Sequence, residues 1–482
     1  MQSRVLKLEA VDIAHNSLHL RFAIDDLRFA TAYWYEGVDF PALAERFGRE
    51  QVDRIAFHIA AFEINKLASL RPDRIDFGTY GRFVTPSFAE LWQTVFHNVW
   101  AEWRYKNDLP DYPGPEFADR PGPDGSEPPV RPETGEIPLL HFCGGGKDSL
   151  VAMKLLERAG AAYDSLAYAA SVYGDMQQQF DLIAGLQAHG AQKRVFRQWV
   201  LDDFLTSPVL DLRPDFGVTT LTAAETPSSI FAALPLVLSR GYSHIALGHE
   251  RSADTGQLRW SKTGEDINHQ WGKSAAAEGL INAYISRYLI EGFSYFSLLK
   301  PIYDTLIFAL LRRDLAAVPA AHSCNIAKPW CRRCAKCLYV WLGYSAFLPR
   351  ETVIAAFGPE NLLEVPENAG LFRQLLGLED QLPFECIGQA GESQLFFALC
   401  RLKGMTGPAM ESFSSAFPDL DLDGLLDRYL TIDWEGTALP ADMAAPLTAL
   451  WTAAIDEARR YVAGLERDVA AGAGPGYSVG RS

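Results

Sequence analysis

The stretch "IPLLHFCGGGKDSLVAMKLLERAG", residues 137–160, decides the fold of this chain. A short apolar run ends in three consecutive glycines, and an amphipathic segment follows at once. This pattern predicts a strand over 137–142, a tight turn, and a helix over 147–160. Glycines at such a turn allow positive φ and close backbone approach, and the first amides of the helix form an anion site. A tight turn that binds nothing is the alternative.

The segments that follow repeat the alternation of strand and helix. Apolar runs at 164–171, 193–200 and 244–250 predict strands, and the amphipathic segments at 176–190 and 228–242 predict helices. Strands that alternate with helices form a parallel sheet through right-handed crossovers, with helices on both faces. The predicted fold class is therefore α/β.

The regions around this core differ in pattern. Residues 4–35 alternate apolar and polar side chains, which predicts an antiparallel meander of half-buried strands. The predicted regions are an N-terminal α+β domain (1–107), a Pro- and Gly-rich linker or loop (108–138), the α/β domain (139–345), a helical C-terminal region (346–468) and a disordered tail (469–482).

The composition limits the partners and the compartment. A formal net charge of −16 argues against a broad nucleic-acid surface, which needs positive charge, but it allows a small anion in a local basic pocket. The N-terminus has no apolar signal core, and no apolar stretch reaches the roughly 20 residues of a membrane span. We therefore expect a cytoplasmic protein with no membrane partner and reduced thiols.

Four of the seven cysteines lie close together in "SCNIAKPWCRRCAKC". Cys324, Cys331, Cys334 and Cys337 follow the spacing Cys-x6-Cys-x2-Cys-x2-Cys, which predicts a closed tetrahedral zinc site. An iron–sulfur cluster takes the same ligands. Four protein ligands leave no open position on the metal, so the expected role is structural. Four unrelated buried cysteines are the remaining alternative.

The glycine turn resembles the Ser-Gly-Gly-x-Asp-Ser loop of the PP-loop ATP pyrophosphatases, whose fold is HUP-like. It is not a Walker A loop, because Asp148 stands where that motif has Ser or Thr directly after Lys147. The resemblance implies a PP-loop domain that binds ATP with Mg²⁺ and releases pyrophosphate. The implied ATP-binding residues are Gly144, Gly145, Gly146, Lys147, Asp148 and Ser149.

Further blocks resemble one family within these enzymes. They read "LGHERSADTG", "EDINHQWGKSAAAEGL", "YFSLLKPIYD", "FGPENLLE" and "LPFECIG". In this order, over roughly 55–390, they resemble the glycopeptidyl-glutamate epimerases of peptidoglycan synthesis. The chain departs from that pattern at Trp271 and Gly272, where an aromatic residue followed by Ser is expected.

The resemblance implies ATP-dependent inversion of the terminal L-Glu of UDP-N-acetylmuramoyl-L-Ala-L-Glu through an acyl-adenylate. An α-proton is hard to remove beside a carboxylate, because the product is a dianion. Adenylation removes that charge, and each unit by which the pKa of the α-carbon falls is worth about 1.4 kcal/mol. The reaction also needs donors or cations around the enolate oxygen, and acid/base groups on opposite faces of the carbon.

Several residues are candidates for these roles. Glu250 and Arg251 follow a predicted strand and are expected to orient nucleotide or substrate, with a surface salt bridge as the alternative. His269 and Lys273 suit phosphate or carboxylate binding, and His269 also suits acid/base catalysis. A structural histidine is the alternative for His269.

The block near the C-terminal end of the resemblance adds two proton carriers. Cys386 becomes a base when its pKa is lowered, and Glu385 is its neighbour. A cysteine that only fills core is the alternative. Lys66 lies in a segment similar to the family's N-terminal region and is expected to reach the substrate.

Other functions fit parts of the chain. The cysteine cluster also resembles that of the 7-cyano-7-deazaguanine synthases, which suggests a PP-loop amidotransferase or nitrile synthase that acts on a deazaguanine. A tRNA-modifying PP-loop enzyme fits the acidic balance less well. A non-catalytic PP-loop protein that binds nucleotide belongs to a different class, and ATP binding without AMP formation would distinguish it.

Overall fold

The computed structural model describes residues 3–119, 121–125, 128–204, 206–207 and 222–471. Its main sheet contains β1 (Val5–Ile13), β2 (Ser17–Ile24), β3 (Leu27–Tyr35), β4 (Arg74–Asp76), β5 (Glu116–Phe117), β6 (Leu139–Cys143), β7 (Asp164–Ala170), β8 (Val195–Asp202), β9 (His244–Glu250) and β12 (Ser294–Leu299). The strand order is β12-β9-β6-β7-β8-β3-β2-β1-β4-β5. A separate small hairpin pairs β10 (Leu258–Arg259) with β11 (Asp266–Ile267).

The main sheet has a parallel half and an N-terminal half that begins antiparallel. Strands β12, β9, β6, β7 and β8 are parallel, so the predicted α/β core is confirmed. Strands β1, β2 and β3 form the predicted antiparallel meander. The two halves join where β3 pairs antiparallel with β8, from Thr31 opposite Asp202 to Tyr35 opposite Gln198. The N-terminal strands therefore extend the same sheet.

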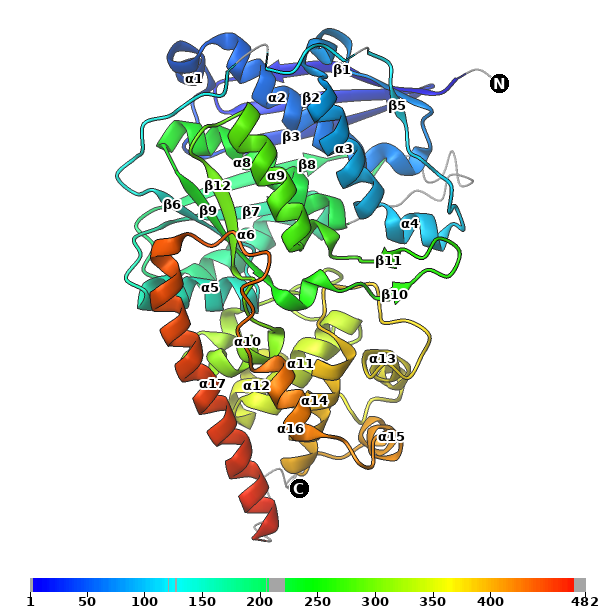
Figure 1. Ribbon diagram of the computed structural model, residues 1–482, viewed down its shortest axis with the longest axis vertical. Coiled ribbons are helices and arrows are strands. Elements are labelled where there is room, and N and C mark those ends of the chain that lie inside the picture. Colours follow the sequence, from blue (N-terminus) through cyan, green and yellow to red (C-terminus); the bar gives the residue numbers. More distant parts are fainter. Residues whose placement is uncertain (1–2, 120, 126–127, 205, 208–221, 472–482) are drawn as a thin grey trace.

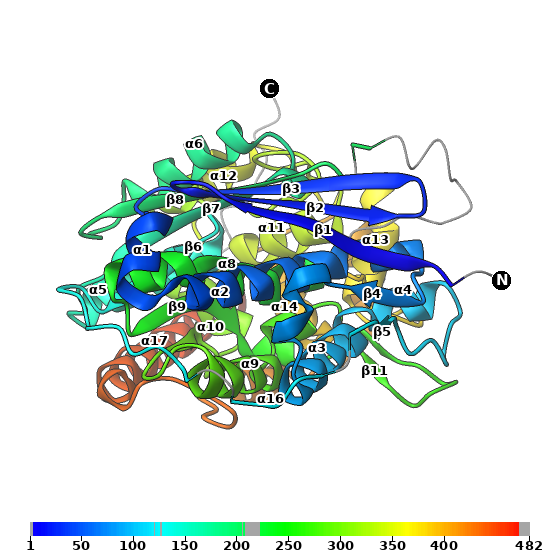
Figure 2. The ribbon, with the colours of Figure 1, turned by 90° about the horizontal axis from the view of Figure 1, so that it is seen from above.

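Helices cover both faces of this sheet. The N-terminal and middle helices are α1 (Phe40–Phe47), α2 (Arg49–Glu63), α3 (Pro86–Val99), α4 (Ala101–Lys106), α5 (Lys147–Arg158), α6 (Met176–Gln187), α8 (Thr222–Arg240) and α9 (Ala275–Tyr288). Leu140 of β6 belongs to the core shared with α2, α3, α8 and α9, whereas Leu139 and Cys143 belong to the core shared with α5 and α6. This alternation is the period of two that a strand imposes. Figure 2 shows α2 and α8 on one side of the strands and α6 on the other.

The C-terminal region forms a helical layer. Its helices are α10 (Asp304–Leu310), α11 (Ala335–Phe347), α12 (Arg350–Phe357), α13 (Ala369–Leu375), α14 (Ala390–Leu402), α15 (Pro408–Ala416), α16 (Leu422–Tyr429) and α17 (Ala441–Ala470). They lie below the sheet in Figure 1, coloured from yellow-green to red. Almost every residue of α11 is buried, because this apolar helix is surrounded by its neighbours. The predicted helical C-terminal region is confirmed.

Two further sequence predictions concern the C-terminal tail and membrane crossing. The predicted disordered tail, 469–482, begins too early, because α17 continues to Ala470, and the tail from position 472 onward lies outside the described residues. Among the described residues, no helix combines the length and apolar character that a membrane crossing requires. The carboxyl ends of β6, β7 and β9 meet at one edge of the sheet, next to the C-terminal helices, and the candidate site lies at this edge.

Candidate active site

The glycine turn joins β6 to α5 at the carboxyl edge of the sheet. Gly145 has a φ of +83°, and a Cβ there would lie 2.2 Å from the ring of His322, so the position requires glycine. Gly144 is exposed, and its amide donates a hydrogen bond to Ser149 Oγ at 3.1 Å. No described side chain caps the first turn of α5. Its amides therefore remain available to an anionic ligand.

A cavity of about 260 Å³ opens beside this turn. The turn contributes four residues to its wall: Gly144, Gly146, Asp148 and Ser149. Three lysines from two distant segments of the chain, Lys273, Lys328 and Lys336, also line it. The carboxylates of Asp148, Glu225 and Glu250 line the same wall, so lysines and carboxylates share the cavity. The turn and the pocket suit a phosphate-bearing ligand.

Lys147 of the turn is not among the residues that line the cavity, unlike Gly146 and Asp148 on either side of it. Its side chain is buried, and its ammonium contacts the carboxylates of Asp148 and Asp304. Burial lowers the pKa of Lys147, but the two carboxylates outweigh this effect and hold it above its ordinary value. Lys147 therefore carries its charge beneath the turn, where it fixes α5 against α10.

The segment that precedes the cysteine cluster crosses the glycine turn. The backbone amide of His322 donates to the carbonyl of Gly145 at 2.8 Å. A Cβ on Gly146 would lie 2.9 Å from Ser323 Oγ, so this contact is also close. His322 and Ser323 both line the cavity. The position of the turn thus depends on the segment that leads into the cluster.

The four predicted metal ligands are brought together. The Sγ atoms of Cys324, Cys331, Cys334 and Cys337 all lie within 4.8 Å of one another, and those of Cys331 and Cys337 are 3.7 Å apart. A tetrahedral zinc ion with Zn–S bonds of about 2.3 Å places its sulfur ligands about 3.8 Å apart. An iron–sulfur cubane binds its thiolates through different irons and spreads them further. The spacing therefore fits a single tetrahedral ion such as zinc.

A second group of side chains forms a chain of hydrogen bonds that ends in the cavity. Glu102 of α4 lies 2.5 Å from His269 Nδ1, and His269 in turn hydrogen-bonds Cys386, whose side chain lines the cavity. Because Glu102 accepts the Nδ1 proton, His269 donates its Nε2 proton to the sulfur. A thiol, an imidazole and an orienting carboxylate in sequence are typical of an activated cysteine.

The charges around Cys386 favour its thiolate. Burial raises the pKa of Cys386, but Lys273, Lys336 and His269 together bring it well below its ordinary value. Burial lowers the pKa of His269, whereas its hydrogen bonds to Cys386 and Glu102 raise it to about 9. The pair at neutral pH is therefore a thiolate and an imidazolium, which is a base and an acid side by side.

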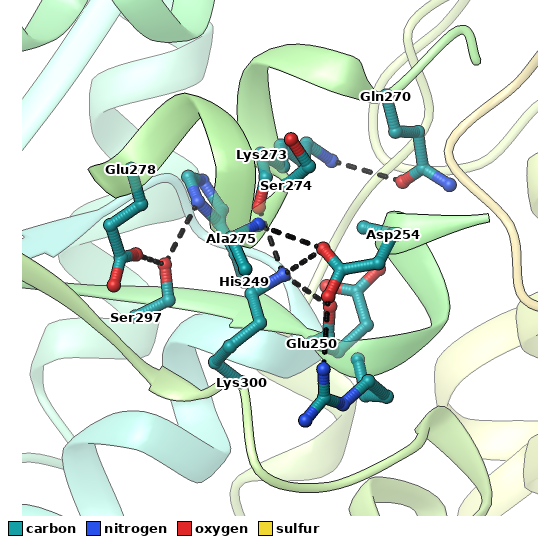
Figure 3. A network of polar contacts seen from close by, with 12 residues as sticks. His249, Glu250, Asp254, Gln270, Lys273, Ser274, Ala275, Glu278, Ser297 and Lys300 are labelled. Carbon is teal, nitrogen blue, oxygen red and sulfur yellow. Dashed lines mark hydrogen bonds and ion pairs between the residues drawn. The ribbon is translucent and has the colours of Figure 1, made fainter. Parts of the chain in front are cut away.

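A buried lysine fixes the backbone on which these groups stand. Lys300 follows β12, and its side chain is fully buried. Its Nζ donates to the carbonyl of Glu250 at 2.8 Å, to Asp254 Oδ1 at 2.9 Å and to the carbonyl of Lys273 at 2.9 Å (Figure 3). These bonds join the end of β9 to the 271–273 turn. The side chains of Glu250 and Lys273 consequently enter one cavity from two segments.

Glu250 and Arg251 are adjacent in sequence but turn apart. Glu250 lines the cavity, and although burial raises the pKa of its carboxyl, Lys273, Lys147 and Lys300 bring it below its ordinary value. Arg251 donates to the carbonyls of Asp433 and Glu435 at 2.7 and 2.8 Å. It therefore contacts the C-terminal segment before α17, and it is not among the residues that line this cavity.

The two other candidates, Glu385 and Lys66, lie beside or behind residues of the cavity wall. Glu385 is half-buried beside Cys386, and burial raises the pKa of its carboxyl, but the cavity wall contains Cys386 and not Glu385. Lys66 is buried between Glu63 and Glu225, at 3.0 and 2.9 Å. Glu225 lines the cavity, so Lys66 stands behind it.

The fold and the site together define an α/β protein with a glycine-rich turn and a cavity at the carboxyl edge of its parallel strands. The family comparison is more specific. The model of the MurL N-terminal domain matches residues 3–183 and 222–298, more than half of the chain, and the model of the MurL C-terminal domain matches 320–407. The chain belongs to the MurL family.

Curated relatives carry one name, UDP-N-acetyl-alpha-D-muramoyl-L-alanyl-L-glutamate epimerase. The protein from Micromonospora sp. is 32% identical over 322 residues, which are 64% of this chain and 67% of that protein. The protein from Salinispora tropica is 32% identical over 324 residues, 65% of this chain and 66% of that protein. The protein from Xanthomonas oryzae pv. oryzae is 29% identical over 277 residues, 55% and 56% of the two chains.

Proposed function

We propose that this protein is an ATP-dependent epimerase that converts the terminal L-Glu of UDP-N-acetylmuramoyl-L-Ala-L-Glu to D-Glu through an acyl-adenylate. Membership of the MurL family and the names of the curated relatives support the epimerase activity and its substrate. A cytoplasmic location fits a nucleotide-linked substrate. ATP, adenylation and the residue roles rest on the site itself.

One observation carries the proposal. The cavity joins the glycine turn, which suits a phosphate chain, to a thiolate–imidazolium pair, which suits proton transfer at carbon. A binding protein needs the first of these features but not the second. Their combination fits a reaction that first activates a carboxylate and then inverts the carbon beside it.

The nucleotide takes the glycine turn in this proposal. Gly144, Gly145, Gly146 and the start of α5, with Ser149, hold the phosphates, and the lysines of the cavity offset their charge. Asp148 and Glu250 are carboxylates of the cavity wall, the donor type that Mg²⁺ takes with phosphates. The substrate's α-carboxylate attacks the α-phosphorus of ATP, and pyrophosphate leaves.

The remaining side chains act at the glutamyl carbon. Lys273 places a cation beside Cys386 and Glu250, where the carbonyl oxygen of the activated substrate gains negative charge. The Cys386–His269 pair carries a proton on one face of the carbon, and Glu102 holds the imidazole. Glu385 is the adjacent acid. Hydrolysis of the adenylate then releases AMP and the D-glutamyl product.

The four cysteines hold a structural zinc ion in this proposal. Zinc would stabilise the 322–337 segment, whose residues cross the glycine turn and supply Lys328 and Lys336 to the cavity.

The test uses the purified chain with ATP, Mg²⁺ and UDP-N-acetylmuramoyl-L-Ala-L-Glu. Chiral chromatography after acid hydrolysis measures D-glutamate, and nucleotide analysis measures AMP and pyrophosphate. We expect D-glutamate to form only with ATP, and AMP to form only with the dipeptide substrate. No D-glutamate with ATP, or equal D-glutamate without it, would contradict the proposal.

A further inference from the structure

A second series of hydrogen bonds reaches the same cavity from strands β9 and β12. His249, near the carboxyl end of β9, lines the cavity, and its Nδ1 lies 3.2 Å from Ser297 Oγ on β12. The Ser297 hydroxyl in turn contacts the carboxylate of Glu278 on α9. Ser297 and Glu278 are both buried. Figure 3 shows the three side chains in line, from Glu278 through Ser297 to the imidazole.

These hydrogen bonds determine the tautomer of His249. A serine hydroxyl has one proton, and the ionised carboxylate of Glu278 accepts it. The Ser297 oxygen must then accept the Nδ1 proton of His249. Within the part of the chain that the structure describes, Ser297 is the hydrogen-bond partner of His249 and Nε2 has none. The neutral ring therefore keeps its lone pair on Nε2.

The surroundings keep this imidazole neutral. Burial lowers the pKa of His249 well below its ordinary value, and the ammonium groups of Lys273 and Lys300 lower it further. The Lys300 ammonium donates its hydrogen bonds to Glu250, Asp254 and Lys273 and not to His249. A neutral imidazole with a free Nε2 is a proton acceptor. It is the complement of the Cys386–His269 pair, which holds a proton to give.

We propose that His249 Nε2 removes the α-proton of the activated L-glutamyl residue and that the Cys386–His269 pair returns a proton to the opposite face. This step rests on the proposed function. The Cα–H bond breaks, its proton goes to Nε2, and its electron pair forms the enolate. The His269 imidazolium passes its Nε2 proton to the Cys386 thiolate, and the S–H proton then forms the new Cα–H bond as the electron pair of the enolate returns to the carbon. His269 regains a proton from solvent. His249 afterwards releases its proton to solvent. Ser297 and Glu278 are positioning residues that hold Nδ1–H.

The chain contains a matched control for this histidine. His244 begins β9, and its Nδ1 lies 3.0 Å from Ser294 Oγ on β12, so the same pair of strands carries a second histidine–serine hydrogen bond. His244 is half-buried like His249, but it is not among the residues that line the cavity. His244→Gln therefore removes an equivalent side chain and hydrogen bond without entering the site.

The test follows deuterium at the α-carbon in deuterium oxide. With the L-substrate and ATP, we expect His249→Gln to lose both deuterium uptake and D-product by about 10²-fold or more, with substrate-dependent AMP release retained. Cys386→Ala is expected to incorporate deuterium into recovered L-substrate without inversion. With the D-epimer as substrate, we expect Cys386→Ala to lose deuterium uptake and His249→Gln to incorporate deuterium into recovered D-substrate without inversion. His244→Gln should match the parent in all assays.

Other results separate this inference from the function on which it rests. His249→Gln that inverts within threefold of the parent, or that no longer releases AMP, would overturn the inference alone. The reverse assignment of the two deuterium phenotypes would also overturn it. A parent protein that makes no AMP and no D-product contradicts the proposed function instead.

A second set of variants tests the positioning residues. Ser297→Ala is expected to lower kcat by about tenfold while the KM values for ATP and dipeptide stay unchanged, because only the imidazole loses its partner. Ser297→Thr, which keeps the hydroxyl, should restore much of kcat, and Ser294→Ala is the matched control. Equal losses in Ser297→Ala and Ser297→Thr, or a change confined to KM, would contradict the positioning role.

Discussion

Strands β9 and β12 carry the same hydrogen bond at both ends, and the two copies have different surroundings. At the amino end, His244 pairs with Ser294, and at the carboxyl end His249 pairs with Ser297. His249 of the second pair lines the cavity beside the glycine turn, and behind it the buried Ser297 hydroxyl contacts the carboxylate of Glu278. The comparison shows that a histidine–serine pair alone does not make a site. Its place at the carboxyl edge of the sheet does.

The largest expected effect removes the cavity thiol. Cys386→Ala should lower formation of D-glutamate by about 10³-fold, because the thiol is the proton carrier on one face. Substrate-dependent AMP release should persist, since the glycine turn is untouched. Cys400→Ala is the control, because Cys400 is buried in α14 and is not part of the cavity wall. Equal activity of the two variants would contradict the assignment.

The next effect comes from the cysteine cluster. Elemental analysis should find about one zinc ion per chain, and cobalt substitution should give a tetrahedral thiolate spectrum. Loss of the ion in Cys331→Ser should raise the KM for ATP by about tenfold, equivalent to about 1.4 kcal/mol, because the 322–337 segment positions the glycine turn. An iron–sulfur absorption spectrum, or an unchanged KM in the metal-free variant, would contradict this account.

A smaller effect is expected from pH. Burial raises the pKa of Glu278 to about 6, so its carboxylate is lost as the pH falls through 6 and Ser297 loses its acceptor. His269, with a pKa of about 9, loses its proton as the pH rises through 9. The profile of kcat/KM should therefore be bell-shaped between these values.

Two variants sharpen the assignment of each limb. Glu278→Gln should remove the limb near pH 6, because glutamine does not titrate. Glu102→Gln should move the limb near pH 9 downward, because the carboxylate of Glu102 supports the imidazolium. Limbs that stay in place in both variants would assign the profile to other groups.

The smallest effect on catalysis is expected at Arg251. Arg251→Met should leave the KM for ATP within about twofold, because the guanidinium contacts the carbonyls of Asp433 and Glu435. The variant should instead lose about 1 kcal/mol of unfolding free energy, since two partly buried carbonyls lose a charged hydrogen-bond donor. Denaturant titration measures this loss. A large rise in KM with unchanged stability would restore the nucleotide role predicted for Arg251.

Much of the fold could be predicted because its signals are local. The glycine turn, the alternation of strands and helices, and the N-terminal meander each lie within short stretches of sequence. The pairing of β3 with β8 has no such signal, because the strands are far apart in the chain and any exposed strand edge offers the same backbone groups. Only the folded chain shows that the meander extends the parallel sheet.

The candidate site likewise contains residues with a local sequence signal and residues that only the fold brings together. Cys324–Cys337 spacing and the turn at Gly144 were recognisable, and His269, Lys273 and Cys386 do converge on or beside one cavity. Glu102 could not be found, because it lies on a short helix of the N-terminal region and meets His269 only through the fold. His249 was within the quoted block "LGHERSADTG", but its partner Ser297 lies on another strand.

The central claim is that ATP activates the glutamyl α-carboxylate before the carbon is inverted. The most direct measurement uses dipeptide substrate whose α-carboxylate carries ¹⁸O, followed by mass spectrometry of the nucleotide. Because the carboxylate oxygen attacks the α-phosphorus and water then attacks the carbonyl carbon of the adenylate, the account predicts that each AMP keeps one labelled oxygen. Inversion with unlabelled AMP, or with no AMP at all, would contradict it.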